Sequence, residues 1–314
     1  MKVFTLLLLF VSIHQVGHSQ KAWKDIISTR DIVLLGEQAH GVQTFYDKKI
    51  DLIQEIDSVS NKELMILVES PLVLSIIRSL QNQVPDYHYN HTNTIENIQF
   101  FNAYKNWGFD LQEDCRYTEF SMFLTAQGYV KPMDEDLLTM DSLLSLNILG
   151  EGYTKEVLSP SESNKLKYAI LNLSNKVLAE IGNAYHHDLL QLCFLNRIYL
   201  AEYLSIPVHN RYKYRMKYRD QIMAENVSSL MKLESDKQVI VWAANLHVGK
   251  KGVYGAKWSK DGLRSMAEYL SEDYNLYCVA IGPRRMEDER FFDWVFTLQN
   301  LETVDVKYLE NDCQ

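Results

Sequence analysis

The sequence predicts an α/β protein with a central, mostly parallel β-sheet flanked by helices and a helical insert over the carboxyl edge of the strands. Two observations support this fold class. Short apolar runs end on glycine or on charged residues, and amphipathic helical patterns separate several of them. A long stretch, from about residue 133 to about residue 233, is almost wholly helical in pattern, which is typical of an insert that covers part of a sheet.

The first elements form a strand–helix–strand unit. Ile32–Leu35 is a fully apolar run, and Leu64–Val68 is a second one. Between them, Phe45, Lys49, Leu52, Ile53 and Ile56 form a stripe at helical spacing. Two strands joined through one helix are parallel and connected by a right-handed crossover, so their carboxyl ends should meet at one edge of the sheet.

Acidic and imidazole groups follow these two strands. Glu37 and His40 lie in the Gly-Glu-Gln-Ala-His-Gly turn after the first strand, and Glu69 follows the second. A neutral imidazole, with an ordinary pKa of about 6.5, takes a proton from water at neutral pH, and an adjacent carboxylate fixes its tautomer. We therefore predict His40 as a general base oriented by Glu37 or Glu69. Each of the three residues also has a structural alternative. Glu37 could cap the following helix, His40 could be a turn histidine without a catalytic role, and Glu69 could end its strand in solvent.

The middle of the chain is predicted to be mainly helical. A short helix is expected at Leu72–Leu80, and a second runs from Thr94 to Lys105. A short strand over Trp107–Gln112 places Asp110 near its end. Four further helices are predicted near Asp134–Asn147, Ser161–Ile181, Tyr185–Leu204 and Tyr214–Leu233.

Strands resume after the helical stretch. The apolar run Gln238–Ala243 ends on Ala244, Asn245, Leu246 and His247, so a further imidazole follows a strand. The remaining elements are predicted as a helix at Leu263–Leu270, a strand at Leu276–Ile281, a helix at Phe291–Leu298 and a short strand near Val304–Val306.

The first residues have the pattern of a signal peptide at 1–19. Lys2 precedes the apolar run Val3–Ile13, and Gly17 and Ser19 supply the small residues before a cleavage site. The run is shorter than the roughly 20 residues that a membrane-spanning helix needs. We expect an exported protein, periplasmic or secreted, with residues 20–314 as a single domain. A retained membrane anchor is the alternative.

Charge and cysteine content exclude some classes of partner. The formal net charge of −9 argues against a nucleic-acid surface, and no membrane contact is expected after signal cleavage. Four cysteines are too few for a disulfide framework and match no zinc spacing. Cys193 and Cys278 lie in apolar runs and are predicted core residues, whereas a Cys115–Cys313 disulfide stays open.

Several motifs in order resemble those of the erythromycin esterase family over nearly the whole mature chain. They are GEQAHG (36–41), VES (68–70), WGFDLQ (107–112), RDQIMAEN (219–226) and VWAANLHVG (241–249). The resemblance implies an α/β fold with a helical insert and hydrolysis of an ester, in named members a macrolide lactone, without a serine nucleophile. It also implies that His40 is the water-activating base and that the supporting positions are Glu37, Glu69, Lys49, Arg219 and His247.

The chain departs from the family pattern at the fourth strand. The family usually has His-Asn-x-His there, whereas Ala244 replaces the first imidazole in this chain. Lys49 also stands where arginine is common. These departures keep a non-catalytic relative, which binds a ligand in the same cleft, among the alternatives.

The predicted function is hydrolysis of a small-molecule ester or lactone. The candidate catalytic residues are His40, Glu37, Glu69 and His247, and the candidate substrate-binding residues are Arg219, Lys49 and Asp110. No cofactor is expected. The alternative is a divalent metal or haem iron, because two carboxylates and two imidazoles (Glu37, His40, Glu69 and His247) suit a transition metal, and more distant relatives with the same GExxH pattern bind one. No Gly-x-Ser-x-Gly elbow and no phosphate-binding loop occurs.

Overall fold

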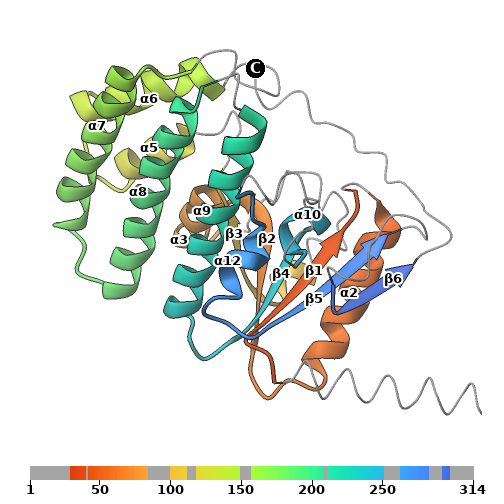
Figure 1. The fold of residues 1–314 in the computed structure, drawn as a ribbon. Helices are drawn as coiled ribbons and strands as arrows, with labels where there is room; N and C mark the ends of the chain where they lie inside the picture. Colours follow the sequence, from red (N-terminus) through yellow and green to blue (C-terminus); the bar gives the residue numbers. More distant parts are fainter. Residues whose placement is uncertain are drawn as a thin grey trace, which may run out of the picture.

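The computed structural model describes residues 29–39, 42–83, 100–111, 118–148, 157–207, 211–250, 262–282 and 292–297. Within these ranges, six strands form one sheet in the order β3-β2-β4-β1-β5-β6, and each neighbouring pair is parallel (Figure 1). The predicted α/β class is confirmed. The strands are β1 (Ile32–Glu37), β2 (Leu64–Pro71), β3 (Lys105–Asp110), β4 (Gln238–Ala244), β5 (Leu276–Gly282) and β6 (Trp294–Thr297).

Helices surround this sheet and form a separate bundle beside it, drawn in yellow and green in Figure 1. The helix α7 starts with a capping box, because the Ser159 hydroxyl accepts from the Glu162 N–H and the Glu162 carboxylate accepts from the Ser159 N–H. The described helices are α2 (Gln43–Asp57), α3 (Leu72–Leu80), α5 (Glu119–Ala126), α6 (Glu135–Ile148), α7 (Pro160–Leu178), α8 (Ala184–Ser205), α9 (Arg211–Leu233), α10 (Asn245–Val248) and α12 (Met266–Leu270).

The strands β1, β2, β4 and β5 send alternate side chains to two separate hydrophobic cores. On β1, Val33 and Leu35 join the core under α2, whereas Ile32 and Leu34 join the core on the opposite face. This alternation is the period-2 rule of a strand buried on both faces. The sheet is therefore covered by α2 on one side and by α3, α9 and α12 on the other.

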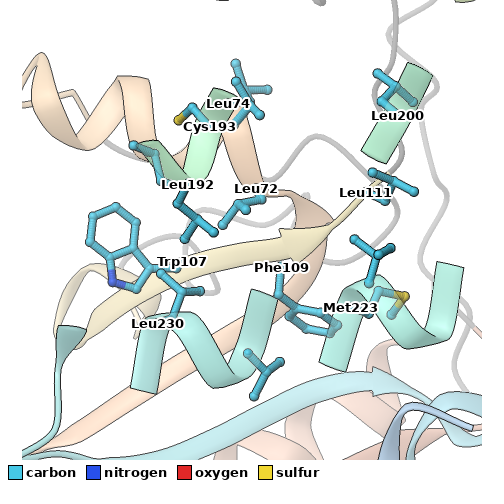
Figure 2. Packing of buried hydrophobic residues seen from close by; sticks show 14 of the residues in the cluster. Leu72, Leu74, Trp107, Phe109, Leu111, Leu192, Cys193, Leu200, Met223 and Leu230 are labelled. Atoms are coloured by element: carbon cyan, nitrogen blue, oxygen red, sulfur yellow. The ribbon is translucent and has the colours of Figure 1, made fainter. Parts of the chain in front are cut away.

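The helical insert is fused to the sheet through one continuous core. Figure 2 shows Phe109 of β3 lying close to Met223 of α9, with Leu72 of α3 and Leu192 of α8 nearby. The bundle formed by α6, α7 and α8 packs on the sheet through the contact of α8 with α3 and α9. The helix α9 also contacts β3 directly, so it places side chains of the insert against the sheet.

The strand order places the chain's first and fourth strands side by side. β4 lies between β1 and β2, so the two strands of the first strand–helix–strand unit are parallel but not neighbours. After β1 the chain enters α2 on one face, and after β4 it continues to α10 and α12 on the other face. Open α/β sheets bind ligands at such a point, where connections leave neighbouring strands toward opposite faces.

Two predicted elements differ from the structure. The helix expected at Phe291–Leu298 is wrong, because Trp294–Thr297 forms β6 and pairs with β5. The run Trp-Val-Phe-Thr is rich in β-branched and aromatic residues, and it satisfies its backbone on an open sheet edge. The helix expected from Thr94 to Lys105 ends earlier, since Lys105 already starts β3. The strand near Val304–Val306 and the leader at 1–19 lie outside the described residues.

The structure also bears on the cysteines and on membrane-spanning helices. Cys193 and Cys278 are buried free thiols, as predicted, while Cys115 and Cys313 lie outside the described residues. Among the helices that the structure describes, none is both long and apolar enough to cross a bilayer.

Candidate functional site

The carboxyl edge of the sheet gathers buried charged side chains from four successive strand ends. Glu37 ends β1, Glu69 lies near the end of β2, Asp110 ends β3 and His247 lies in the short helix after β4. All four side chains are buried. Arg219 of α9 reaches Asp110, Glu69 and His247 from the insert. Burial of a charge is costly unless it is paired, so the partners of each group define the site.

On the α2 side, Lys49 forms an ion pair with Glu37. The distance from Lys49 Nζ to Glu37 Oε2 is 3.0 Å, and both side chains are 0% exposed. The ammonium also lies 4.6 Å from the centre of the Trp242 ring. Burial lowers the pKa of Lys49 to about 8, although the neighbouring carboxylates of Glu37 and Glu69 oppose this shift. This pair is a buried, dehydrated charge pair next to the predicted catalytic turn.

On the α9 side, Arg219 links two strands. Its Nε and Nη2 atoms donate to the two oxygens of Asp110 at 2.9 and 2.6 Å, and Nη2 also donates to Glu69 Oε1 at 2.9 Å. The fork of a guanidinium matches a carboxylate in this bidentate way. Burial disfavours the charge, but Asp110, and after it Glu69, raise the pKa of Arg219 well above its ordinary value.

His247 lies between two carboxylates. Its Nδ1 is 2.6 Å from Asp220 Oδ1, and its Nε2 is 3.3 Å from Glu69 Oε1 and 3.4 Å from Arg219 Nη1. Burial opposes a charged imidazole, but Asp220 and Glu69 outweigh it and raise the pKa of His247 to about 10. A raised pKa favours the protonated form of this ring at neutral pH.

One peptide bond joins the two halves of the site. Lys49 Nζ donates to the carbonyl oxygen of Ala243 at 3.2 Å, and the N–H of Ala244 donates to Glu69 Oε2 at 2.8 Å. These groups belong to the same peptide unit at the end of β4. The ammonium and the carboxylate thus bind opposite ends of one amide dipole. The N–H end of this amide holds the Glu69 carboxylate in place.

A close backbone approach sets the position of α10, which carries His247. A Cβ added at Gly36 would lie 2.2 Å from Asn245 Oδ1 and 3.0 Å from Asn245 Cα. Asn245 is buried, and its side-chain amide donates to the Ile281 carbonyl at 3.4 Å. Glycine at the end of β1 is therefore needed for α10 to dock on β1 and β5.

The structure brings most of the predicted site residues together. On sequence alone Arg219 also fits a solvated helix face, because it follows other basic residues, yet its side chain is only 13% exposed. His40 lies outside the described residues, so its predicted role as base stays a prediction. The residues that converge are Glu37, Lys49, Glu69, Asp110, Arg219 and His247.

Asp220 is the buried acid that sequence reasoning missed. It is 0% exposed, directly follows Arg219, and contacts the ring of His247. The available signal was the position of an acid inside an amphipathic helix, next to a basic residue already assigned to the site. A lone acidic residue in a charged helical segment is ordinarily solvated, so this signal is weak.

A metal site would need several histidine, cysteine, aspartate or glutamate side chains around one point. Within the described ranges, no group of three or more histidine, cysteine, aspartate or glutamate side chains is arranged to hold a metal ion. Because His40 lies outside these ranges, the full set of Glu37, His40, Glu69 and His247 stays a prediction.

Sequence comparison identifies a family over part of this chain. Residues 165–284 match the model of the erythromycin esterase family. This segment runs from α7 to the residues after β5, so it contains Arg219, Asp220 and His247 but not the Glu37 turn. The resemblance to erythromycin esterases is therefore confirmed over this segment. No match was found among curated protein sequences.

Solved structures share the fold at low sequence identity. A protein from Bacillus cereus is 15% identical, with a TM-score of 0.59 over 84% of this chain and 68% of that chain. A mutant of the erythromycin esterase EreC in its open conformation is 15% identical, with a TM-score of 0.57 over 82% and 71%. A succinoglycan biosynthesis protein is 17% identical, with a TM-score of 0.58 over 83% and 68%. At these identities the likeness shows the fold alone.

Proposed function

We propose that this chain, whose residues 165–284 match the erythromycin esterase family, is a hydrolase that cleaves an ester or lactone with water activated by His40. The observation that supports this best is a pair of positively charged donors at the strand edge. Arg219 Nη1 and His247 Nε2 lie 3.4 Å apart. Two donors at this separation suit one oxygen atom, as in the oxyanion holes of acyl-transfer enzymes.

The contacts of Arg219 leave Nη1 beside His247, and in this proposal the same nitrogen also binds the substrate. Nε and Nη2 donate to Asp110 and Glu69, whereas Nη1 contacts no carboxylate among the described residues. The Arg219 side chain is 13% exposed. In this proposal, Asp110 and Glu69 orient the guanidinium, and Nη1 donates to the developing oxyanion.

The contacts also favour one of the two candidate orienters of His40. Glu69 is committed to Arg219, to the Ala244 N–H and to the edge of His247. Glu37 is three positions before His40 at the end of β1, and Lys49 holds its charge. We therefore assign Glu37 as the carboxylate that orients the base, and Lys49 as the group that holds Glu37 ionised.

The proposed reaction follows from these roles. Water attacks the carbonyl carbon while its proton passes to His40, and the carbonyl oxygen becomes an oxyanion between Arg219 and His247. The intermediate collapses by breaking the carbon–oxygen bond of the leaving group, and the His40 imidazolium returns the proton to the leaving alkoxide. A carboxylic acid and an alcohol are the products.

The test is hydrolysis of a panel of esters and lactones by the purified protein and by His40→Asn. We expect turnover of at least one substrate and a fall of about 10²–10⁴-fold in kcat for the variant, which is the usual contribution of a general base. The matched control is His187→Asn on α8, whose ring contacts the side chain of Asp188. Unchanged turnover in the His40 variant would contradict the proposal.

A second candidate is ligand binding at the same site without turnover. Ala244 favours it, because its side chain has no group that can bind or transfer a proton. In that case the panel would show no hydrolysis while one of its members raises the melting temperature of the protein.

A further inference from the structure

Asp220 has a feature that the proposed reaction does not use. It is completely buried in α9, next to Arg219, and its Oδ1 lies 2.6 Å from His247 Nδ1. A 2.6 Å contact is in the short range expected of a charge-assisted hydrogen bond. A buried carboxylate is costly unless its partner compensates the charge. The contact therefore indicates a specific interaction with the imidazole.

The two proposed donors of the oxyanion site, Arg219 and His247, both carry a positive charge when His247 is protonated. Like charges 3.4 Å apart in a buried site repel strongly, and neighbouring anions must balance them. Asp110 is bound in bidentate fashion to Arg219, and Glu69 is shared between Arg219 and His247. Asp220 is the carboxylate in closest contact with the imidazole.

The same contacts are compatible with two states of the ring. In the neutral state, Nδ1–H donates to Asp220, and Nε2 accepts from Arg219 Nη1. In the charged state, Nδ1–H donates to Asp220 and Nε2 also carries a proton, 3.3 Å from Glu69 Oε1 and 3.4 Å from Arg219 Nη1. Only the charged state presents a second N–H beside Arg219. Among the residues that the structure describes, the charged groups in contact with the ring are Asp220 and Arg219 of α9 and Glu69 of β2, with two negative charges and one positive charge.

We propose that Asp220 is a positioning residue that holds His247 as a doubly protonated ring, with Nε2–H beside Arg219 as the second donor of the oxyanion site. Burial of the ring opposes this state, and the two carboxylates outweigh it, which gives His247 the raised pKa noted above. The helical insert thus supplies both a donor, Arg219, and the anion that maintains the other donor. The kinetic part of this inference rests on the proposed function, but the protonation state of the ring does not.

The direct test is nitrogen-15 NMR of the His247 ring in the full-length protein at pH 7.5, assigned by comparison with His247→Gln. The proposal expects both ring nitrogens of the wild-type protein to be protonated. In Asp220→Asn the amide keeps the size of the carboxylate but not its charge, and Nε2 should lose its proton at this pH. The matched control is Glu225→Gln on the same helix, whose carboxylate accepts a hydrogen bond from Gln221. The control removes one charge and should leave the ring protonated.

Three results would overturn the proposal. They are a neutral His247 in the wild-type protein, an unchanged ring in folded Asp220→Asn, and a control that deprotonates the ring as fully as Asp220→Asn does. If Asp220→Asn does not fold, Asp220→Glu is measured instead, since it keeps the charge and should keep a protonated ring. The wild-type spectrum alone already decides whether the ring is charged.

The kinetic test separates this inference from the proposed function. If the protein hydrolyses an ester, Asp220→Asn should lower kcat by about 10- to 100-fold with little change in KM, because the lost donor acts on the transition state. Asp220→Glu should recover part of kcat. If no ester is hydrolysed, the function proposal fails, and the NMR result still tests the role of Asp220. Full kcat in a variant with a neutral ring would overturn the assignment of His247 as a donor.

Discussion

Charged groups at both ends of strand β3 form ion pairs with residues in or just after helix α9, and the two pairs differ in burial. At the carboxyl end of β3, Asp110 binds Arg219 in bidentate fashion, and both side chains are nearly buried. At the amino end, Lys105 lies 3.3 Å from Glu234, and the lysine side chain is 35% exposed. The two ends of β3 therefore carry one buried and one partly solvated ion pair.

The two networks differ in their contact with water. The amino-end group continues to Lys237 and then to Glu63, whose side chain is 84% exposed, so water solvates these charges. The carboxyl-end group continues inward to Glu69, His247 and Asp220, where water is largely excluded. Exposed pairs contribute little to stability, and a buried network is kept only if every member is compensated.

The largest effect is expected from Arg219→Met. The substitution leaves Asp110 and Glu69 buried near each other without their cation, and the loss of one partner of a buried pair costs about 5 kcal/mol at the upper end of the usual range. Urea denaturation measures this change in the free energy of unfolding. The control Lys217→Met lies on the same helix at a surface groove and should change it by less than about 1 kcal/mol. Equal losses in both variants would contradict the assigned role of the buried network.

A smaller loss is expected from Lys49→Met, on the other side of the sheet edge. The ammonium is itself dehydrated by burial, so its removal relieves one cost while it leaves Glu37 unpaired. We expect a loss of about 3 kcal/mol. In the double variant Lys49→Met with Glu37→Gln, part of this loss should be recovered, because no buried charge remains. Additive losses in urea titrations would show that the two side chains are not coupled.

The pH dependence of stability should separate His247 from Lys49. The pKa of His247 is raised from 6.5 to about 10, so its contribution is fully present below pH 6.5 and is lost as the pH rises through 10. The pKa of Lys49 is lowered from 10.5 to about 8, so its burial cost is present below pH 8 and is relieved toward pH 10.5. The two effects have opposite signs between pH 8 and 10.

The measurement compares His247→Gln with the wild-type protein between pH 6 and 10. The difference in unfolding free energy should shrink as the pH rises, by at most about 1.4 kcal/mol per pH unit for one proton. A difference that does not change with pH would indicate that His247 has the same pKa in the folded and unfolded states.

The sequence was sufficient to predict which edge of the sheet carries the candidate site, because the ends of four strands follow directly from the apolar runs. Once two strands are known to be parallel, Glu37 and Glu69 must face the same edge, as the structure shows. Periodicity also predicted the helix that contains Arg219. It did not predict the partners of that arginine, because the rotation of a helix about its axis is set by packing between distant segments.

The features that the sequence did not predict depend on such long-range contacts. Asp220 is distinguishable from a solvated acid only after α9 has been placed against β3 and α10. The insertion of β4 between β1 and β2 also leaves no local pattern, since parallel strands buried on both faces have similar apolar sequences. Likewise, a short run such as residues 294–297 becomes a strand because β5 offers an unpaired edge.

The smallest effect is expected at the amino end of β3, and it provides the counterpart to Arg219. In Lys105→Met the ion pair with Glu234 is lost, but the aliphatic stem can still pack near Trp107, whose ring centre is 4.6 Å from the ammonium. Because the lysine is partly solvated, the loss should stay below about 1 kcal/mol, and kcat should not change. Urea denaturation and the ester assay measure both quantities. A loss as large as that of Arg219→Met would mean that burial does not distinguish the two ends of β3. The amino-end network would then be as important for holding the insert on the sheet as the candidate site itself.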